Sequence, residues 1–295
     1  MDDKRFPTDE ELTVILSRLG ISDAGCEQFR DGEGGDPYAV WLVRCGRGDF
    51  VLKRAKAFEA EVYRCFFTEK KPYAPACFGS VTHGGEQYLL LEYCPGDDLR
   101  RCRREALVKA LDAIAAMQNE FWERKELYGA ACTMDRALEA IDRRGKYLGA
   151  ARLEAVYAQF REIYRKTPRS LCHDDLLPIN VIVGERAVLI DWEYGGVLPY
   201  LSSFARLIAH GREKADAYLY MTDADRDFAI EYFFESLPKK RGISYAEYRR
   251  SLDFFLIYEY CEWIMIGNRY DMREDERYLF CLQKADALAD RLLHE

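Results

Sequence analysis

The sequence predicts an α+β protein of two lobes, in which a small antiparallel sheet with one helix precedes a mainly helical region. Three observations support this prediction. Short apolar segments separated by turns fill the first 92 residues, and helical periodicity dominates from residue 99 onward. A single strand-like hairpin interrupts the helices between residues 171 and 196. An irregular polar segment inside a helical lobe is where functional residues are expected.

The N-terminal region combines one short helix with two hairpins. A capping box from Thr8 to Glu11 predicts a helix that ends at Gly20. Glycine-containing turns at 46–48 and 83–85 predict the hairpins, and residues 58–67 have helical spacing. The strands that we expect are 27–30, 39–45, 49–54, 77–82 and 87–92.

The character of the chain changes at Pro95 and Gly96, which predicts a hinge. We therefore expect an N-terminal lobe at 1–92, a hinge at 93–98 and a C-terminal lobe at 99–295. Two short strands, 181–183 and 188–190, are expected within the helical lobe. The helices that we expect there are 101–119, 134–144, 150–166, 223–236, 245–266 and 275–293.

Composition narrows the class of protein. Of 295 residues, 49% are hydrophobic and 14% aromatic, enough for a sizeable core without disulfides. The net charge of −8, with no run of five like charges, argues against nucleic-acid or membrane-surface partners. Ten cysteines without a C-x-x-C pair argue against structural zinc. With a charged N-terminus and no long apolar stretch, we predict a soluble, cytoplasmic protein with reduced thiols.

The polar segment carries the pattern H-x-D-x-x-x-x-N, formed by His173, Asp175 and Asn180, and a strand that ends in Asp191 follows it. Phosphoryl transfer needs a carboxylate that orients the attacking hydroxyl and oxygen ligands for Mg²⁺ on the nucleotide phosphates. We expect Asp175 and His173 to be catalytic, and Asn180 and Asp191 to bind the metal. Turn formation would explain any one of these residues, but not all four together.

The other parts of a nucleotide site have candidates. Lys53, at the end of the third strand, is expected to contact the α and β phosphates. Glu59 or Glu61 in the next helix would hold this lysine, and Glu59 is favoured because apolar residues follow it at helical spacing. Main-chain groups of Glu92 and Cys94 are expected to bind a purine at the hinge.

On these residues the chain resembles the aminoglycoside phosphotransferase and choline kinase superfamily. The superfamily signature H-[GN]-D-x-x-x-x-N, followed by I-D-[WF]-E, matches at 173–180 and 190–193, and the sequence Asp-Trp-Glu-Tyr is closest to the choline/ethanolamine kinase form. The resemblance implies a protein-kinase-like fold, ATP or GTP as donor and Mg²⁺ as cofactor. It also implies that residues 1–92 bind the nucleotide and that the helical lobe holds the catalytic loop and the acceptor pocket.

Three departures from the family pattern stand out. Asp174 replaces the usual Gly or Asn, and Ser203 stands where relatives often have Asp. No G-x-G-x-x-G is present, and the expected covering loop at 31–36 carries three acids. A phosphate cradle there would use the backbone N–H groups of Gly34 and Gly35.

The acceptor is expected to be a small molecule. A protein kinase needs about twenty or more residues of activation loop after the metal-binding aspartate, whereas a helix is expected soon after Pro199. The acids and aromatics of Glu259, Glu262 and Trp263 suggest a cationic acceptor, such as an aminoglycoside, choline or ethanolamine. The alternative is a weak or inactive kinase-like binding protein.

Overall fold

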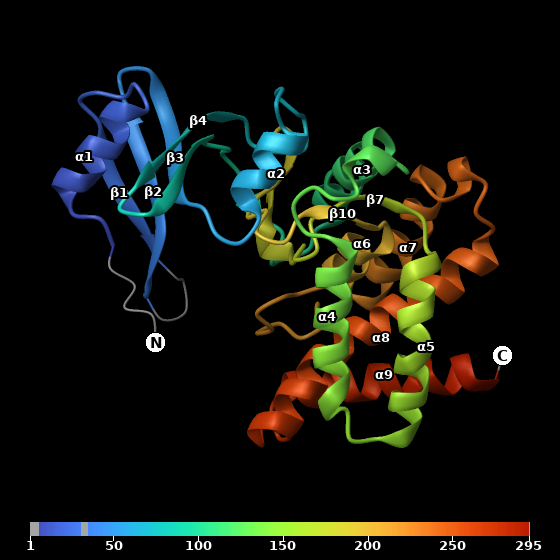
Figure 1. Cartoon of the computed structure of the whole chain (residues 1–295). Coiled ribbons are helices and arrows are strands. Elements are labelled where there is room, and N and C mark those ends of the chain that lie inside the picture. Colours follow the sequence, from blue (N-terminus) through green and yellow to red (C-terminus); the bar gives the residue numbers. More distant parts are fainter. Residues whose placement is uncertain (1–5, 31–34, 295) are drawn as a thin grey trace.

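The computed structural model describes residues 6–30 and 35–294, which form two lobes (Figure 1). The N-terminal lobe is a five-stranded antiparallel sheet with strand order β1-β2-β3-β5-β4, and the hairpins predicted from glycine-containing turns are present. Its elements are α1 (Asp9–Arg18), β1 (Gly25–Arg30), β2 (Pro37–Cys45), β3 (Gly48–Arg54), α2 (Glu59–Phe66), β4 (Cys77–His83) and β5 (Glu86–Glu92).

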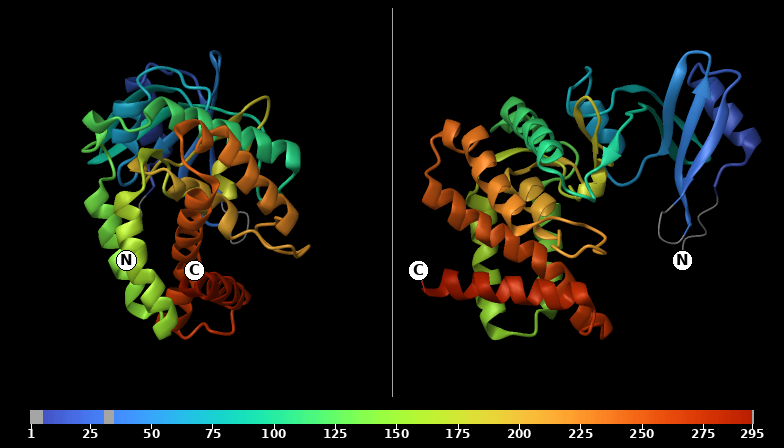
Figure 2. Two further views of the ribbon diagram at one scale, coloured as in Figure 1. Left: turned by 90° about the vertical axis from the view of Figure 1, so that its right-hand side faces the viewer. Right: turned by 180° about the vertical axis from the view of Figure 1, so that it is seen from behind.

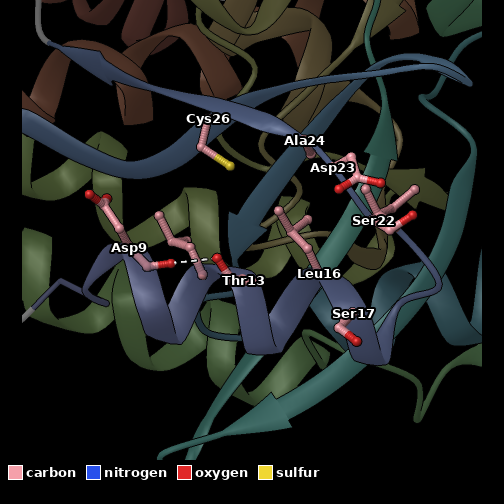
Figure 3. Close-up of a pocket in the computed structure, with 10 residues that line it drawn as sticks. Asp9, Thr13, Leu16, Ser17, Ser22, Asp23, Ala24 and Cys26 are labelled. Atoms are coloured by element: carbon pink, nitrogen blue, oxygen red, sulfur yellow. Dashed lines mark hydrogen bonds between the residues drawn. The ribbon is translucent and has the colours of Figure 1, made fainter.

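Helix α1 covers one face of this sheet. The predicted capping box is formed, because Thr8 Oγ1 accepts from the Glu11 N–H while the Glu11 carboxylate accepts from the Thr8 N–H. The apolar side of α1 shares a small core with the sheet residues Trp41 and Leu52. A hollow of about 470 Å³ lies between α1 and β1, at the outer end of the lobe and away from the C-terminal lobe (Figure 3).

Helix α2 belongs to a different core from α1. Phe66 packs edge-on against Phe121 of the C-terminal lobe, and Phe67 packs against Trp192. These contacts place α2 beside the C-terminal lobe rather than over the sheet (Figure 1). Glu59, at the start of α2, is therefore positioned by the core of the C-terminal lobe. In contrast, β3 is part of the N-terminal sheet.

The C-terminal lobe is mainly helical, with two small sheets of order β6-β8-β9 and β10-β7. Helix α8 runs through its centre, and α9 packs across it (Figure 2). The elements are β6 (Asp97–Asp98), α3 (Arg104–Phe121), α4 (Met134–Arg144), α5 (Ala151–Lys166), β7 (Arg169–Cys172), β8 (Val181–Val183), β9 (Ala187–Leu189), β10 (Gly196–Pro199), α6 (Leu201–Ala209), α7 (Asp223–Ser236), α8 (Tyr245–Tyr270) and α9 (Glu276–His294), with short 3-10 turns at 125–127, 145–147, 178–180 and 239–241.

The structure adds three strands to the prediction. β7 pairs antiparallel with β10, and the polar segment with His173, Asp175 and Asn180 lies between them in the chain. β6 pairs with β8, so residues 97–98 of the predicted hinge belong to the sheet of the C-terminal lobe. These strands have two to four residues, too few to show a period, and they form only through pairing with distant partners.

The state of the cysteines and the apolar length of the helices bear on two of the sequence-based expectations. All ten cysteines carry free thiols. Over the part of the chain that the structure describes, no helix combines the length and the apolar character that crossing a bilayer requires.

Candidate active site

Lys53 lies near the end of β3 and is buried, with 8% of its surface exposed. Its Nζ donates to Glu59 Oε1 at 2.8 Å and contacts Asp191 Oδ1. Burial by itself would lower the pKa of Lys53, but the charges of Glu59 and Asp191 raise it above its ordinary value. Glu61 instead pairs with Arg64 at 3.7 Å. Lys53 is therefore a cation held between two carboxylates, Glu59 of α2 and Asp191 of the C-terminal lobe.

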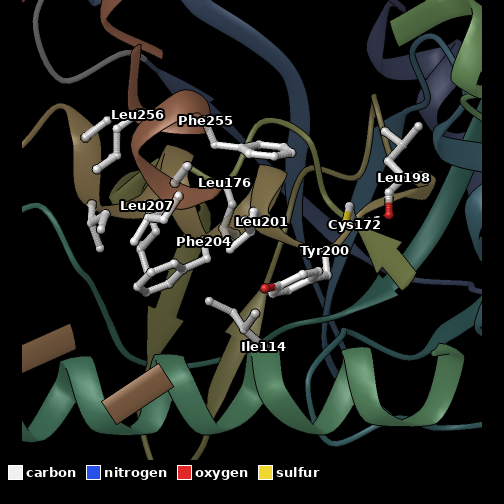
Figure 4. Close-up of a cluster of buried hydrophobic side chains, with 14 of the residues drawn as sticks. Ile114, Cys172, Leu176, Leu198, Tyr200, Leu201, Phe204, Leu207, Phe255 and Leu256 are labelled. Atoms are coloured by element: carbon white, nitrogen blue, oxygen red, sulfur yellow. Dashed lines mark hydrogen bonds between the residues drawn. The ribbon is translucent and has the colours of Figure 1, made fainter. Parts of the chain in front are cut away.

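Buried side chains hold the loop from His173 to Asn180 in place. The backbone N–H of His173 donates to Ser203 Oγ at 2.8 Å, and its ring Nε2 lies 2.6 Å from the Ile190 carbonyl oxygen. Burial lowers the pKa of His173, so the ring is neutral and Nε2–H donates to that carbonyl. Leu176 is packed into the core of the lobe among Leu201 and its neighbours (Figure 4). His173 thus supports the loop, and Ser203 supplies a hydrogen bond at the position where relatives often have Asp.

Asp174 and Asp175 have different surroundings although they are adjacent. Asp174 has a left-handed backbone, with φ of 59°, a conformation that Gly, Asn and Asp tolerate best. Burial and the charge of Glu259 raise the pKa of Asp174 to about 7. Burial also raises the pKa of Asp175, although the Arg206 guanidinium opposes this effect. The left-handed backbone at position 174 accepts the Asp of this chain as well as the Gly or Asn of the family pattern.

Asn180 links the loop to the strand that leads to Asp191. Its Nδ2 donates to the backbone oxygen of Asp175 at 2.8 Å, which ties the two ends of the five-residue step together. The backbone carbonyl oxygen of Asn180 accepts a hydrogen bond from the Ile190 N–H at 2.9 Å. Since the amide nitrogen is used within the loop, the side-chain oxygen of Asn180 and the carboxylate of Asp191 remain as oxygen donors, which fits Mg²⁺.

A second charged cluster lies on the other side of Asp175 and is centred on Arg206 of α6. Arg206 Nε and Nη2 donate to Asp175 Oδ1 at 3.1 and 2.9 Å. Arg206 Nη1 donates to Glu259 Oε2 at 2.9 Å and also to Glu262. Nη1 lies 3.1 Å from Nε2 of His210 as well. One guanidinium therefore joins the loop that carries Asp175 to α8.

The three residues expected to bind the acceptor have partners within the chain. Glu259 is 4% exposed and bonded to Arg206, and Glu262 pairs with both Arg206 and Arg144. These charges lower the pKa of Glu262 to about 2, against the effect of burial. The Trp263 ring is covered by Arg277, whose guanidinium carbon lies 3.9 Å from the ring centroid. All three side chains thus contact arginines of the chain itself.

The remaining nucleotide candidates are Gly34, Gly35, Glu92 and Cys94. Gly34 is outside the described residues, while Gly35 has a φ of +70° in the turn between β1 and β2. Glu92 ends β5, and its carboxylate accepts from Lys70 and Arg186. Cys94 is half-buried two residues later.

Sequence reasoning missed the two arginines of the second cluster. Arg206 had a usable signal, because it is the single charged residue in a helix whose other members are all buried. A lone arginine in an apolar helix predicts a buried ion pair. Arg144, at the end of α4, had no comparable signal, because basic residues are common in the last turn of a helix.

A two-lobed fold that holds a Lys–Glu–Asp cluster beside an Asp–Asn loop defines the class of kinase-like phosphotransferases. Residues 26–238 match the family described as the phosphotransferase enzyme family, APH. This match covers more than two thirds of the chain, so the chain belongs to that family.

Two curated relatives and several solved structures are similar to the chain. Protein LicA from Haemophilus influenzae strain KW20 Rd is 38% identical over 74 residues, which are 24% of this chain and 28% of LicA. A second Protein LicA from Haemophilus influenzae is also 38% identical over 74 residues, which are 22% of that protein. The chain therefore matches about a quarter of the length of these relatives.

The solved structures share the fold. A provisionally assigned aminoglycoside phosphotransferase from Ralstonia eutropha JMP134 superposes with a TM-score of 0.60 at 13% identity, covering 97% of this chain and 96% of that one. The type VIII aminoglycoside-3'-phosphotransferase has a TM-score of 0.53 at 17% identity, over 82% of this chain and 97% of that one. A provisionally assigned fructosamine-3-kinase from Haemophilus somnus 129PT has a TM-score of 0.55 at 13% identity, over 96% and 97%.

Proposed function

We propose that this phosphotransferase moves the γ-phosphate of ATP or GTP to a hydroxyl group of a small, cationic molecule. The observation that carries the proposal is the pair of linked contacts around the loop. Lys53 joins Glu59 to Asp191, and Asn180 joins Asp175 to the strand before Asp191. A phosphate-binding cation, two metal-ligand candidates and a base thus belong to one connected set.

In the proposed reaction Asp175 accepts the proton of the acceptor hydroxyl as its oxygen attacks the γ-phosphorus. A new O–P bond forms, the bond from phosphorus to the bridging oxygen breaks, and the nucleoside diphosphate leaves with that electron pair. The raised pKa of Asp175 suits this role, because a base with a pKa nearer the working pH takes a proton more readily. His173 has no direct part in proton transfer and holds the loop in position.

Asn180 and Asp191 would hold Mg²⁺, which when bound neutralises charge on the nucleotide phosphates. Lys53 would contact the α and β phosphates. The contact between Lys53 and Asp191 compensates both charges in the absence of nucleotide. When Mg-nucleotide binds, a phosphate would take the place of Asp191 beside Lys53, and the metal would take the place of Lys53 beside Asp191. Main-chain groups at Glu92 and Cys94 would bind the purine, and the N–H groups of Gly34 and Gly35 would approach the phosphates.

A small acceptor is favoured over a protein because the segment after Asp191 is short. β10 begins at Gly196 and is paired with β7, and α6 begins at Leu201. An activation loop of about twenty or more residues has no place in this segment.

A cationic acceptor is favoured by the charge around Asp175. Four carboxylates, those of Asp174, Asp175, Glu259 and Glu262, interact with two arginines, Arg144 and Arg206. A protonated or quaternary amine near Asp174 would stabilise its ionised form, which burial disfavours. The carboxylates thus outnumber the arginines. We therefore propose that the acceptor amine compensates the excess negative charge and does not displace Arg206 from Glu259 or Glu262.

The test is release of nucleoside diphosphate by the purified chain with Mg-ATP or Mg-GTP. The panel would contain choline, ethanolamine, kanamycin and glucosamine as cations, and glycerol and glucose as neutral controls. The proposal expects release with at least one cation, transfer of phosphate to its hydroxyl, and no stimulation by the neutral compounds. Stimulation by the neutral compounds alone would overturn the cationic acceptor. Nucleotide binding without transfer to any compound would favour the inactive, kinase-like alternative.

A further inference from the structure

Arg206 is held in a site built for a guanidinium. The side chain is 12% exposed, and the other members of α6 are buried. An arginine taken out of water is costly unless each charge is compensated, so a buried arginine needs several acceptors. Here the acceptors come from the catalytic loop and from α8, and their charges raise the pKa of Arg206 despite its burial.

The acids and the histidine around Arg206 resemble a metal site at first sight. His210, Glu259 and Glu262 offer ligand atoms that lie within 4.8 Å of one another. However, Nη1 of Arg206 lies among them, 2.9 Å from Glu259 Oε2 and 3.1 Å from His210 Nε2. The guanidinium already supplies the positive charge in this position, so the cluster binds an arginine and not a metal.

The geometry at Asp175 is asymmetric. Both hydrogen bonds from Arg206 go to the same oxygen, Oδ1. Within the described residues, no side chain or backbone group donates to Oδ2. The two nitrogens that bind Oδ1 belong to one planar, rigid fork, so they fix the position of this oxygen, while Oδ2 keeps its acceptor sites.

We propose that Arg206 is a positioning residue for the reaction: it holds Oδ1 of Asp175 so that Oδ2 faces the acceptor hydroxyl, and Glu259 and Glu262 hold Arg206 in turn. This inference rests on the proposed function. It assigns the two glutamates to the support of the base rather than to contact with the acceptor amine. It also makes the orientation of Asp175 depend on α8, which carries both glutamates.

The first test replaces Arg206 with lysine, which keeps the positive charge but lacks the planar pair of N–H donors that binds Asp175 Oδ1. We expect kcat for the acceptor found in the panel above to fall about 10- to 100-fold, because a small misplacement of a catalytic group has an effect of this order. The KM for Mg-ATP should stay within about twofold, because Arg206 is bonded to none of the nucleotide candidates. A purely structural role would instead lower the amount of folded enzyme and leave kcat per folded molecule unchanged.

The matched control is Arg226→Lys on α7. Arg226 is also a buried arginine, but it donates to the carbonyl oxygens of Ile208 and Gly211 and contacts Asp223, not Asp175. Thermal melting of both variants shows how much stability each has lost. The proposal expects a loss of kcat in Arg206→Lys alone, even where the melting temperatures fall equally.

A second variant, Arg206→Ala, leaves room for a free guanidinium ion. Millimolar guanidinium chloride should restore kcat about tenfold or more in this variant and leave the wild type unchanged. The inference is overturned if folded Arg206→Lys keeps the wild-type kcat, or if both arginine variants lose kcat in step with stability. If the wild-type chain itself transfers no phosphate to any compound, the proposed function has failed, and this inference falls with it.

Discussion

Two ion clusters flank the loop from His173 to Asn180, and they differ in how they are built. The Lys53 cluster joins the two lobes, because Lys53 lies on β3 and Asp191 lies 138 residues later, after β9. The Arg206 cluster lies wholly within the C-terminal lobe and joins α6 to the catalytic loop and α8. The first cluster contains the compact ammonium group of Lys53, which suits phosphate binding. The second contains the planar guanidinium of Arg206, whose several N–H donors suit the positioning of carboxylates. The difference indicates that the Lys53 cluster depends on how the two lobes meet, whereas the Arg206 cluster depends on the packing of α6 against α8.

The largest expected effect belongs to the Lys53 cluster. Asp191→Asn removes the charge that would hold Mg²⁺ and should lower kcat by about 10³-fold or more, since metal charge stabilisation amounts to several kcal/mol. Phosphate transfer with and without added Mg²⁺ measures the effect. Asp142→Asn, an exposed carboxylate paired with Arg161, serves as the control. Full transfer by a folded Asp191→Asn protein would contradict the assignment of the nucleotide side.

The next effect separates the two adjacent carboxylates of the loop. Asp175→Asn should lower kcat by about 10²- to 10⁴-fold, the usual range for a general base. Asp174→Asn should lower it less than about tenfold, because Asn also tolerates the left-handed backbone at this position. Single-turnover rates with saturating nucleotide measure both. The opposite order would mean that Asp174 is the base.

A smaller effect is expected on nucleotide binding. Lys53→Ala should weaken binding of Mg-ATP or Mg-GTP about tenfold or more, because it removes a charge-assisted contact and leaves Glu59 buried without its partner. Calorimetric titration of the nucleotide measures this change. Lys239→Ala, an exposed lysine paired with Glu235 on α7, is the control. Equal affinity in wild type and Lys53→Ala would remove Lys53 from the nucleotide site.

The smallest expected effect concerns stability in acid. The pKa of Glu262 is about 2 in the folded protein and near 4.5 when unfolded, so its ionised form favours folding. This contribution, on the order of 3 kcal/mol, is present above pH 4.5 and is lost as the pH falls toward 2. Urea unfolding of wild type and Glu262→Gln should therefore show a difference in stability at pH 6 that shrinks below pH 4.5. A difference that is constant with pH would show that the arginines do not hold this carboxylate.

The sequence was sufficient for much of the fold because the evidence was local. The capping box at Thr8 and the glycine turns of the two hairpins depend on residues a few positions apart, and the structure contains each of them. Membership of a kinase-like family also followed from a short motif, and the match over residues 26–238 confirms it. The contact between Lys53 and Glu59 was predicted for a similar reason, since six residues separate them at the end of a strand and the start of a helix.

The strands β7 and β10 and the arginine cluster were decided by tertiary structure. β7 and β10 are four residues long, and their pairing brings together segments that start 27 residues apart. Arg206 meets Asp175, Glu259 and Glu262 across 31, 53 and 56 residues. The composition of α8 alone suggested free acids for a cationic ligand. Since a charge pair depends on distance in space and not along the chain, only the packing of α6 against α8 determined that those acids hold an arginine.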